Sequence, residues 1–365
     1  MTPTQTPAHA VLELARFAPS GDNTQPWRFV LRSADGFDVY AYDTRDSCVY
    51  DLDGWASELA HGMLFETIAV AATRHSRRAE IVAASAPGER PAHYRVALLA
   101  DPHGTPDPLA DAIVARTVQR QPLPMRPLTA EARTALEAAA VPYRVRWFDS
   151  WRARMRIARL AMRNARIRLT IREAYDVHRA VIAWHATTSE DRMPDASLGA
   201  SPMLLALMRF GMTSFERLDR MNRVSGTFVP RMALDFLPGV RCSASLALVA
   251  PSNPATTAER VAAGRAAQRV WLTATAFGLQ MQPQYTPLVF ARYAREGRPF
   301  TTAQAGATRA RAVAEELESI MGDETERTVW LARIGYARPV RGRSTRLPLD
   351  RLVVDEAPAR LSIPR

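Results

Sequence analysis

Lysine is absent from this chain of 365 residues, and all 48 of its basic side chains are arginines. This absence excludes Schiff-base chemistry, a Walker-type phosphate-binding loop and a lysine general base. Arginine can still capture a phosphate through two parallel hydrogen bonds. The arginine bias and the net charge of +11 are therefore compatible with nucleic acid or a phosphate group as a ligand. A GC-rich genome is the simpler explanation of the arginine bias.

Cysteine and long apolar runs are also scarce. Cys48 and Cys242 are the only cysteines, and they lie far apart without the spacing of metal ligands. No apolar stretch is long enough for a membrane span, and residues 1–9 lack the basic and apolar regions of a signal peptide. From these absences we expect a cytoplasmic protein in a reducing environment.

Hydrophobic periodicity divides the chain into two parts, joined by the polar and proline-rich segment 100–108. In the first part it predicts, in order, a helix, a pair of strands, a helix and a strand, at 11–15, 27–31, 37–42, 53–72 and 93–99. In the second part it predicts helices at 109–118, 129–140, 151–171, 258–277 and 303–321, and strands at 143–148, 243–249 and 328–336.

Two segments of the second part have alternative interpretations. One face of the helix 151–171 is basic, which favours a solvated surface over an anionic partner or a membrane surface; it carries Arg152, Arg156, Arg159, Arg163 and Arg166. Residues 186–240 have no regular pattern except the methionine-rich run 202–212. That run predicts a helix buried in the core, with the lining of an adaptable pocket as the alternative.

The most informative motif is the turn A-P-S-G-D-N-T-Q-P-W at positions 18–27. Ser20, Asn23 and Gln25 place neutral hydrogen-bonding groups on a stiff backbone, next to the flat aromatic ring of Trp27. Such groups suit a planar heterocycle with carbonyls and ring nitrogens better than they suit a phosphate or a metal ion. The turn therefore predicts the edge of a ring-binding site.

Two basic motifs offer partners for a phosphate. In the segment 115–139, Arg116 and Arg120 are four residues apart at the end of a predicted helix, so we expect them on one face, where Thr117 adds a hydroxyl. The tail 334–353 holds further arginines. An exposed helix end with unrelated arginines is the alternative interpretation of the first motif.

These motifs resemble those of the FMN-dependent nitroreductase superfamily. The turn resembles the signature small-Ser-x-x-Asn-x-Gln-Pro-Trp, and the segment 115–139 resembles the Arg-Arg-Ser-x-Arg opening of single-domain members. The segment 263–283 resembles the helix and Gly-Leu turn along the flavin, with Gly278 as the helix stop. The tail resembles the family's basic ending at Gly335, Tyr336, Arg343, Arg346 and Pro348.

The resemblance implies FMN as the cofactor. It assigns the ring edge to Ser20, Asn23 and Gln25. It assigns the phosphate and ribityl chain to basic and hydroxyl groups of the second part: Arg116, Thr117, Arg120, and one or more of Arg341, Arg343 and Arg346. It implies an oxidoreductase in which NAD(P)H is the usual electron donor and a small organic molecule is the substrate, because the flavin itself does the chemistry.

The order of the motifs differs from that of a single-domain member, in which the arginine motif precedes the turn. Residues 1–105 have the turn alone, and residues 106–365 have the arginine motif and the tail alone. Ordinary members are homodimers with flavin sites across the interface, so we expect two fused halves that form a pseudo-dimer with one complete site. This arrangement resembles the tandem, Acg-type branch of the superfamily. We expect an α+β nitroreductase-like fold of mainly antiparallel sheets flanked by helices, with 186–240 as a lid insertion.

Other chemistries have less support. No G-x-G-x-x-G follows a predicted strand, and D-L-D-G at 51–54 lacks the remaining ligands of an EF-hand. His61 is more simply a packed residue than a catalytic acid. His178 and His185 are expected on one helical face, but a third metal ligand is missing.

Three functional questions stay open at this stage. An alternative to turnover is a protein that binds and sequesters flavin. Nucleic-acid binding lacks a recognition motif, and the protein is expected to be a monomer or a homodimer. Asp22 has no assigned role, since its charge would lie close to that of a reduced flavin.

Overall fold

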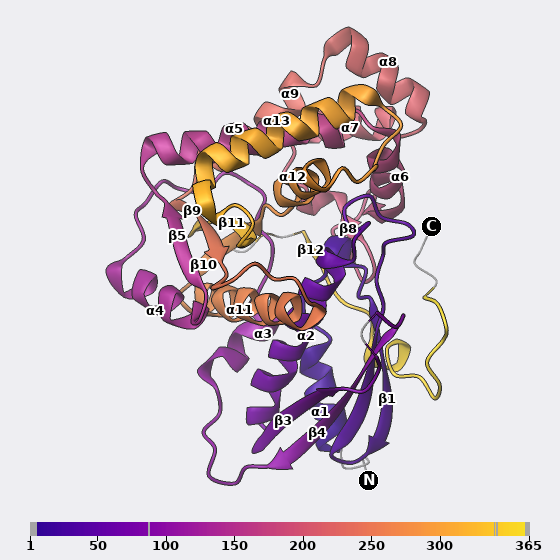
Figure 1. The fold of residues 1–365 in the computed structure, drawn as a ribbon, viewed down its shortest axis with the longest axis vertical. Coiled ribbons are helices and arrows are strands. Elements are labelled where there is room, and N and C mark those ends of the chain that lie inside the picture. Colours follow the sequence, from indigo (N-terminus) through magenta and orange to yellow (C-terminus); the bar gives the residue numbers. More distant parts are fainter. Residues whose placement is uncertain (1–5, 87, 339, 341, 362–365) are drawn as a thin grey trace.

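The computed structural model describes residues 6–361 except 87, 339 and 341. It shows an α+β protein with two four-stranded antiparallel sheets in separate parts of the molecule, and two long helices, α2 and α11, lie between them (Figure 1). No helix in the described ranges combines the length and the apolar character that crossing a bilayer requires.

The first sheet consists of β1 (Trp27–Ser33), β2 (Gly36–Ala41), β3 (Arg77–Ala83) and β4 (Ala92–Ala100), in the order β1-β2-β4-β3. Helix α1 (Pro7–Ala15) precedes β1, and α2 (Trp55–Thr73) connects β2 to β3. Alternation along β1 and β2 directs Trp27, Phe29 and Phe37 into a core that α1 and α2 cover. Burial of this apolar surface stabilises the first unit.

The second sheet repeats this topology. Its strands are β5 (Arg144–Phe148), β9 (Ala244–Val249), β10 (Leu279–Pro283) and β11 (Thr328–Tyr336). Helix α4 (Ala130–Ala140) precedes β5, and α11 (Thr257–Ala276) connects β9 to β10. In both units the chain runs strand, strand, helix, strand, strand, and the spatial order is first, second, fourth, third. The two units therefore share one arrangement.

Helices α2 and α11 pack against each other at a pair of glycines. A Cβ atom on Gly62 would lie 1.9 Å from the carbonyl oxygen of Val261, and one on Gly264 would lie 2.0 Å from that of Leu59. Val261 lies three residues before Gly264, and Leu59 lies three residues before Gly62. The crossing is thus reciprocal, and only glycine allows the two backbones to come so close.

Two segments from the second part of the chain complete the first unit. Residues 109–113, in the short helical turns η2 (Pro108–Asp111) and α3 (Ala112–Ala115), pack into the core of the first sheet. The C-terminal segment 347–352 does the same, and the amide of Phe29 donates to the carbonyl of Leu352 at 2.9 Å. The chain after α11 therefore returns to the first sheet.

Long insertions distinguish the second unit from the first. Between β5 and β9 lie α5 (Trp151–Arg168), α6 (Arg172–Val181), α7 (Pro202–Gly211), α8 (Phe215–Ser225), α9 (Phe228–Arg231) and α10 (Leu237–Val240), with a π-helical turn at Met232–Phe236. Between β10 and β11 lie α12 (Thr286–Glu296) and α13 (Gln304–Met321). A short parallel pair, β6 (Ile182–Ala183) with β8 (Met193–Pro194), lies within the insertion, and a second, β7 (Thr188–Ser189) with β12 (Arg343–Ser344), joins the insertion to the tail.

Most of the expected elements are confirmed, and three expectations are wrong. The helix expected at 109–118 ends at Ala115, and Arg116 has an extended ψ of 125°. Arg116 and Arg120 are therefore not neighbours on a helical face. Helix α6 ends at Val181, so His185 does not share a helical face with His178.

The third error concerns the methionine-rich run. It forms α7, but only Leu204 and Gly211 are buried there, and Met203 is 83% exposed. The helix lies at the surface of the insertion rather than in the core. Its apolar side chains have the pattern of a buried helix, but α8 covers only part of them, and Met203, Leu207 and Phe210 remain exposed.

Candidate functional site

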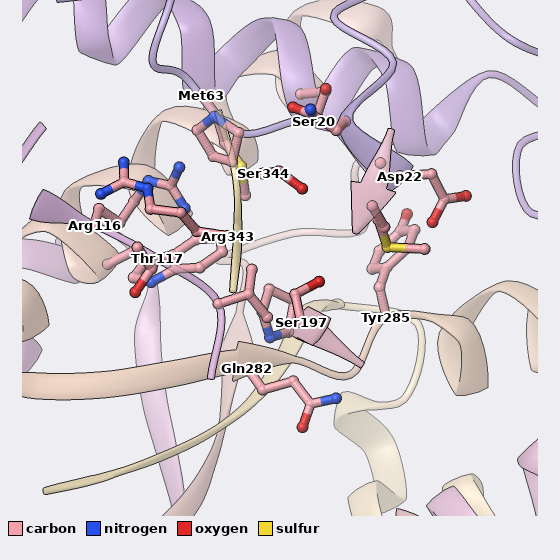
Figure 2. Close-up of a pocket in the computed structure, with 18 of the residues that line it drawn as sticks. Ser20, Asp22, Met63, Arg116, Thr117, Ser197, Gln282, Tyr285, Arg343 and Ser344 are labelled. Atoms are coloured by element: carbon pink, nitrogen blue, oxygen red, sulfur yellow. The ribbon is translucent and has the colours of Figure 1, made fainter. Parts of the chain in front are cut away.

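A cavity of about 230 Å³ lies between the two units, at the end of the α2–α11 pair. A single water molecule needs only about 10–15 Å³, so the space is suited to an organic ligand. Its walls come from the turn 19–23, helix α2, the extended segment 116–120, helix α11, strand β10 and the tail 342–346. Figure 2 shows the labelled side chains of this cavity.

Three arginines gather at one end of the cavity. Arg116 is buried, and its guanidinium lies 4.4 Å from the centre of the Trp271 ring. Among the described residues, its side chain makes one hydrogen bond, a long one of 3.3 Å to the carbonyl of Phe17. Arg343 donates to the carbonyl of Val114 at 3.0 Å, and Arg346 donates to the carbonyl of Ala18 at 3.0 Å. In the described part of the chain, no carboxylate forms an ion pair with any of the three.

The positive charges of Arg116 and Arg346 are destabilised by their surroundings. Burial lowers the pKa of Arg116 well below its ordinary value, and Arg346 and Arg343 lower it further by repulsion. Burial also lowers the pKa of Arg346 to about 10, with Arg343 and Arg16 adding to the effect. The Nε–H groups of Arg116 and Arg343 are buried and have no acceptor among the residues that the structure describes. An anion at this end of the cavity would supply both the missing charge and the missing acceptors.

The other predicted residues of the arginine motif lie in the same wall. Thr117 is buried and its hydroxyl donates to Oε1 of Gln280 at 3.3 Å. Arg120 lines the cavity away from the three arginines and donates to the carbonyl of Ser197 at 3.2 Å. The backbone is extended here, and the amide of Gln119 donates to the carbonyl of Met281 at 3.0 Å. Because of this extended conformation, the side chains of Arg116 and Arg120 line different parts of the cavity.

The turn 18–27 forms the opposite wall. Asn23 lines the cavity, and its Nδ2 group donates to the carbonyl of Glu190 at 3.0 Å. Its Oδ1 atom is buried and has no donor in the described part of the chain. Ser20 also lines the cavity, and its hydroxyl oxygen accepts from the amide of Gln25 at 2.9 Å. The turn thus presents one unsatisfied acceptor and one hydroxyl to a ligand.

Gln25 lies behind this wall and does not line the cavity. Its side chain donates to the carbonyl of Glu190 at 2.8 Å and accepts from the amide of Leu347 at 2.9 Å. Both ends of its amide are therefore used to tie the turn to the insertion and the tail. Asp22, Asn23 and Gln25 have positive φ angles of 51°, 65° and 46°, which are uncommon outside glycine and often mark functional sites.

The far end of the cavity contains residues that the sequence motifs did not identify. Figure 2 shows Asp22 and Tyr285 there, opposite Arg116 and Arg343. Gln282 also lines the cavity, and the buried Arg333 donates to its Oε1 atom at 2.6 Å. This bond fixes the amide of Gln282 so that its Nε2 group remains available. The Gln-x-Gln alternation at 280–282 was the only sequence signal for these positions.

Solved structures that align with the chain do so at low identity. They include a nitroreductase with bound FMN from Bacteroides fragilis NCTC 9343, at 10% identity over 64% of this chain and 89% of that chain, with a TM-score of 0.34. A nitroreductase-like family protein from Bacillus cereus aligns at 12% identity over 68% and 95%, with a TM-score of 0.35. The FMN-dependent nitroreductase NfnB from Mycobacterium smegmatis, in complex with NADPH, aligns at 18% identity over 67% and 96%, with a TM-score of 0.33.

No family model and no curated protein sequence matches the chain. Since the TM-scores are below 0.5, function has to be argued from the residues of the cavity.

Proposed function

We propose that this protein binds FMN in the cavity and acts as a flavin-dependent oxidoreductase of nitroreductase type. The observation that carries the proposal is the cluster of Arg116, Arg343 and Arg346. Their charges face no carboxylate in the described chain, and two of their Nε–H groups lack an acceptor. A phosphate dianion suits such a cluster, since arginine binds phosphate with charge-assisted hydrogen bonds.

The remaining walls fit the other parts of the cofactor. The buried Oδ1 atom of Asn23 needs a donor, which a flavin ring provides through its N–H group. Apolar and aromatic side chains, including Leu59, Met63 and Trp330, also line the cavity. A plane of carbonyls and ring nitrogens would therefore find both packing and hydrogen bonds here.

When bound, FMN would supply the transfer of electrons to a small organic acceptor. The chain's own contribution is to hold and surround it. The three arginines would retain the phosphate, Asn23 and Ser20 would orient the ring edge, and the walls of α2 and α11 would exclude water. NAD(P)H is proposed as the electron donor on the strength of the motif resemblance alone.

We also propose that the chain is a fusion of two nitroreductase-like halves, divided near residue 105. The shared strand order and the reciprocal glycine crossing support this proposal. The segments 109–113 and 347–352 that complete the first core would then correspond to arms exchanged between subunits. The insertion that we expect to act as a lid contributes Met193 and Ser197 to the cavity wall.

Comparison of the two halves also predicts that the second half lacks a flavin site of its own. The connection from α1 to β1 is the turn-bearing segment 16–26, whereas α4 and β5 are joined by residues 141–143 alone. If Gly62 corresponds to Gly264, the cavity residue Met63 corresponds to Arg265, whose side chain pairs with Glu66 at 3.0 Å. An ion pair would therefore occupy the wall of the second site.

Incubation of the purified chain with FMN, followed by dialysis and a turnover assay, tests this function. We expect retained flavin and oxidation of NADH or NADPH that depends on an added quinone. A protein that sequesters flavin would retain FMN with almost no turnover. Failure to retain FMN would contradict both the enzymatic and the sequestering interpretation.

A further inference from the structure

We propose that Asp22 is the catalytic acid that protonates the acceptor at the end of the cavity opposite the arginine cluster. This inference rests on the proposed function, and it names a role for the one residue of the turn 18–27 that the motif leaves unexplained. It also defines the class of acceptor, namely molecules such as quinones whose two-electron reduction requires protons.

The position of Asp22 is the first observation. Its backbone has a φ of 51° and a ψ of 19°, a left-handed conformation that aspartate tolerates better than most residues. This conformation places its side chain in the cavity wall, on the side of Tyr285 and away from Arg116 and Arg343 (Figure 2). An acid at this end would face the bound acceptor rather than the phosphate.

A second, smaller cavity provides the independent observation. It has a volume of about 50 Å³, and Gly21, Asp22, Ala56 and Ala60 line both cavities. The remaining walls include several polar groups: Thr24, Thr44, Tyr50, Asp51 and Ser57. This volume and these partners are sufficient for ordered water. Asp22 therefore stands between the ligand cavity and a polar side chamber that can return a proton to it.

The charges around Asp22 are compatible with a proton donor. Burial raises the pKa of Asp22, while Arg120 and Arg168 oppose the rise. Cys48 and Tyr50 also face it, and burial raises the pKa of both, so these two groups stay neutral. Behind them, Tyr50 bonds to His178 at 3.0 Å, and Arg168 pairs with Asp235 at 2.5 Å. Of the two carboxyl groups in this cluster, Asp22 and Asp235, Asp22 lines the ligand cavity.

The proposed step balances in protons and electrons. Conversion of a quinone to a hydroquinone takes up two electrons and two protons. When bound and reduced, FMN would supply both electrons and one proton, and the Asp22 carboxyl would donate the second proton to the quinone oxygen. The resulting carboxylate then regains a proton from water in the side chamber.

The test compares two acceptors on the full chain loaded with FMN and reduced by dithionite. A quinone requires protons, whereas ferricyanide takes electrons alone. We expect Asp22→Asn to slow reoxidation by the quinone at least tenfold and to change reoxidation by ferricyanide by less than about threefold. Asp22→Glu should recover part of the quinone rate. The matched control Asp46→Asn removes an exposed carboxylate and should change neither rate.

Two further measurements separate a proton donor from a structural role. In the wild type, the quinone rate should fall as pH rises through the pKa of Asp22, since only the protonated carboxyl donates, and this dependence should disappear in Asp22→Asn. The FMN dissociation constant, measured by fluorescence titration, should change by less than about threefold. If Asp22→Asn slowed reoxidation equally with both acceptors, or left the quinone rate unchanged, the inference would be wrong, but the proposed flavin binding would not be affected. Absence of FMN binding would instead contradict the proposed function on which the inference rests.

Discussion

Replacement of Arg116 by methionine is expected to weaken FMN binding roughly 10- to 150-fold and, at the same time, to raise the melting temperature of the FMN-free protein. Loss of a charge-assisted phosphate contact costs about 1.5–3 kcal/mol, which corresponds to that range. The opposite effect on stability follows from burial. Arg116 is a buried cation whose neighbours Arg343 and Arg346 repel it, and methionine keeps a contact with the Trp271 ring.

Fluorescence titration with FMN and thermal unfolding without it measure the two effects separately. The matched control is Arg152→Met, which removes an exposed arginine at the start of α5 and should change neither quantity. A purely structural role for Arg116 predicts the reverse pattern, with lower stability and unchanged affinity per folded molecule. Such a pattern would remove the basis for the phosphate site.

Substitution of Gly62 by alanine is expected to destabilise the fold by about 1–3 kcal/mol or more. The added methyl group would lie 1.9 Å from the carbonyl oxygen of Val261 and 2.8 Å from Cα of Gly264, so helices α2 and α11 must move apart. Both helices line the cavity, at Leu59, Met63 and Trp271. FMN affinity should therefore fall together with stability.

Urea unfolding of the FMN-free protein provides the free energy of unfolding for this comparison. Gly211→Ala on α7 is the matched control, because the atoms nearest its added Cβ belong to the flexible side chains of Leu218 and Met221. We expect the control to stay within about 1 kcal/mol of the wild type, since alanine also has the better helix propensity. Equal stability of Gly62→Ala and the wild type would show that the two helices do not cross closely.

The sequence predicted the elements whose periodicity matched their burial. The β1–β2 hairpin, α2, α5, α11 and β11 lie where the pattern placed them. Strand β3 was missed because it is an edge strand, and its exposed alternate residues, such as Arg78 and Glu80, hide the apolar signal. Strand β10 was missed because glutamines and a proline interrupt it.

The course of the chain at Arg116 shows why a local pattern was insufficient. Apolar spacing favoured a continuous helix over 109–118, but Val118 forms a bridge with Met281 of β10. This long-range pairing extends the backbone, and no local propensity reports it. As a result the arginine motif lines the cavity as an extended wall rather than as a helical face.

The candidate site itself was predictable only in part. Of the nine expected residues, Arg341 lies outside the described residues and Gln25 does not line the cavity. The other seven do: Ser20, Asn23, Arg116, Thr117, Arg120, Arg343 and Arg346. Motif resemblance brought them together although they come from three distant segments. Asp22, Gln282 and Tyr285 could not be assigned in the same way, because only the folded chain brings the turn, β10 and the start of α12 to one end of the cavity.

The amount of FMN bound per chain is the most direct test of the account. The whole chain would be saturated with FMN, freed of unbound flavin by gel filtration, and analysed for flavin and protein concentration. One fused pseudo-dimer with a single complete site predicts about one FMN per chain. Two FMN molecules per chain would contradict the missing second site, and none would contradict the flavin site itself.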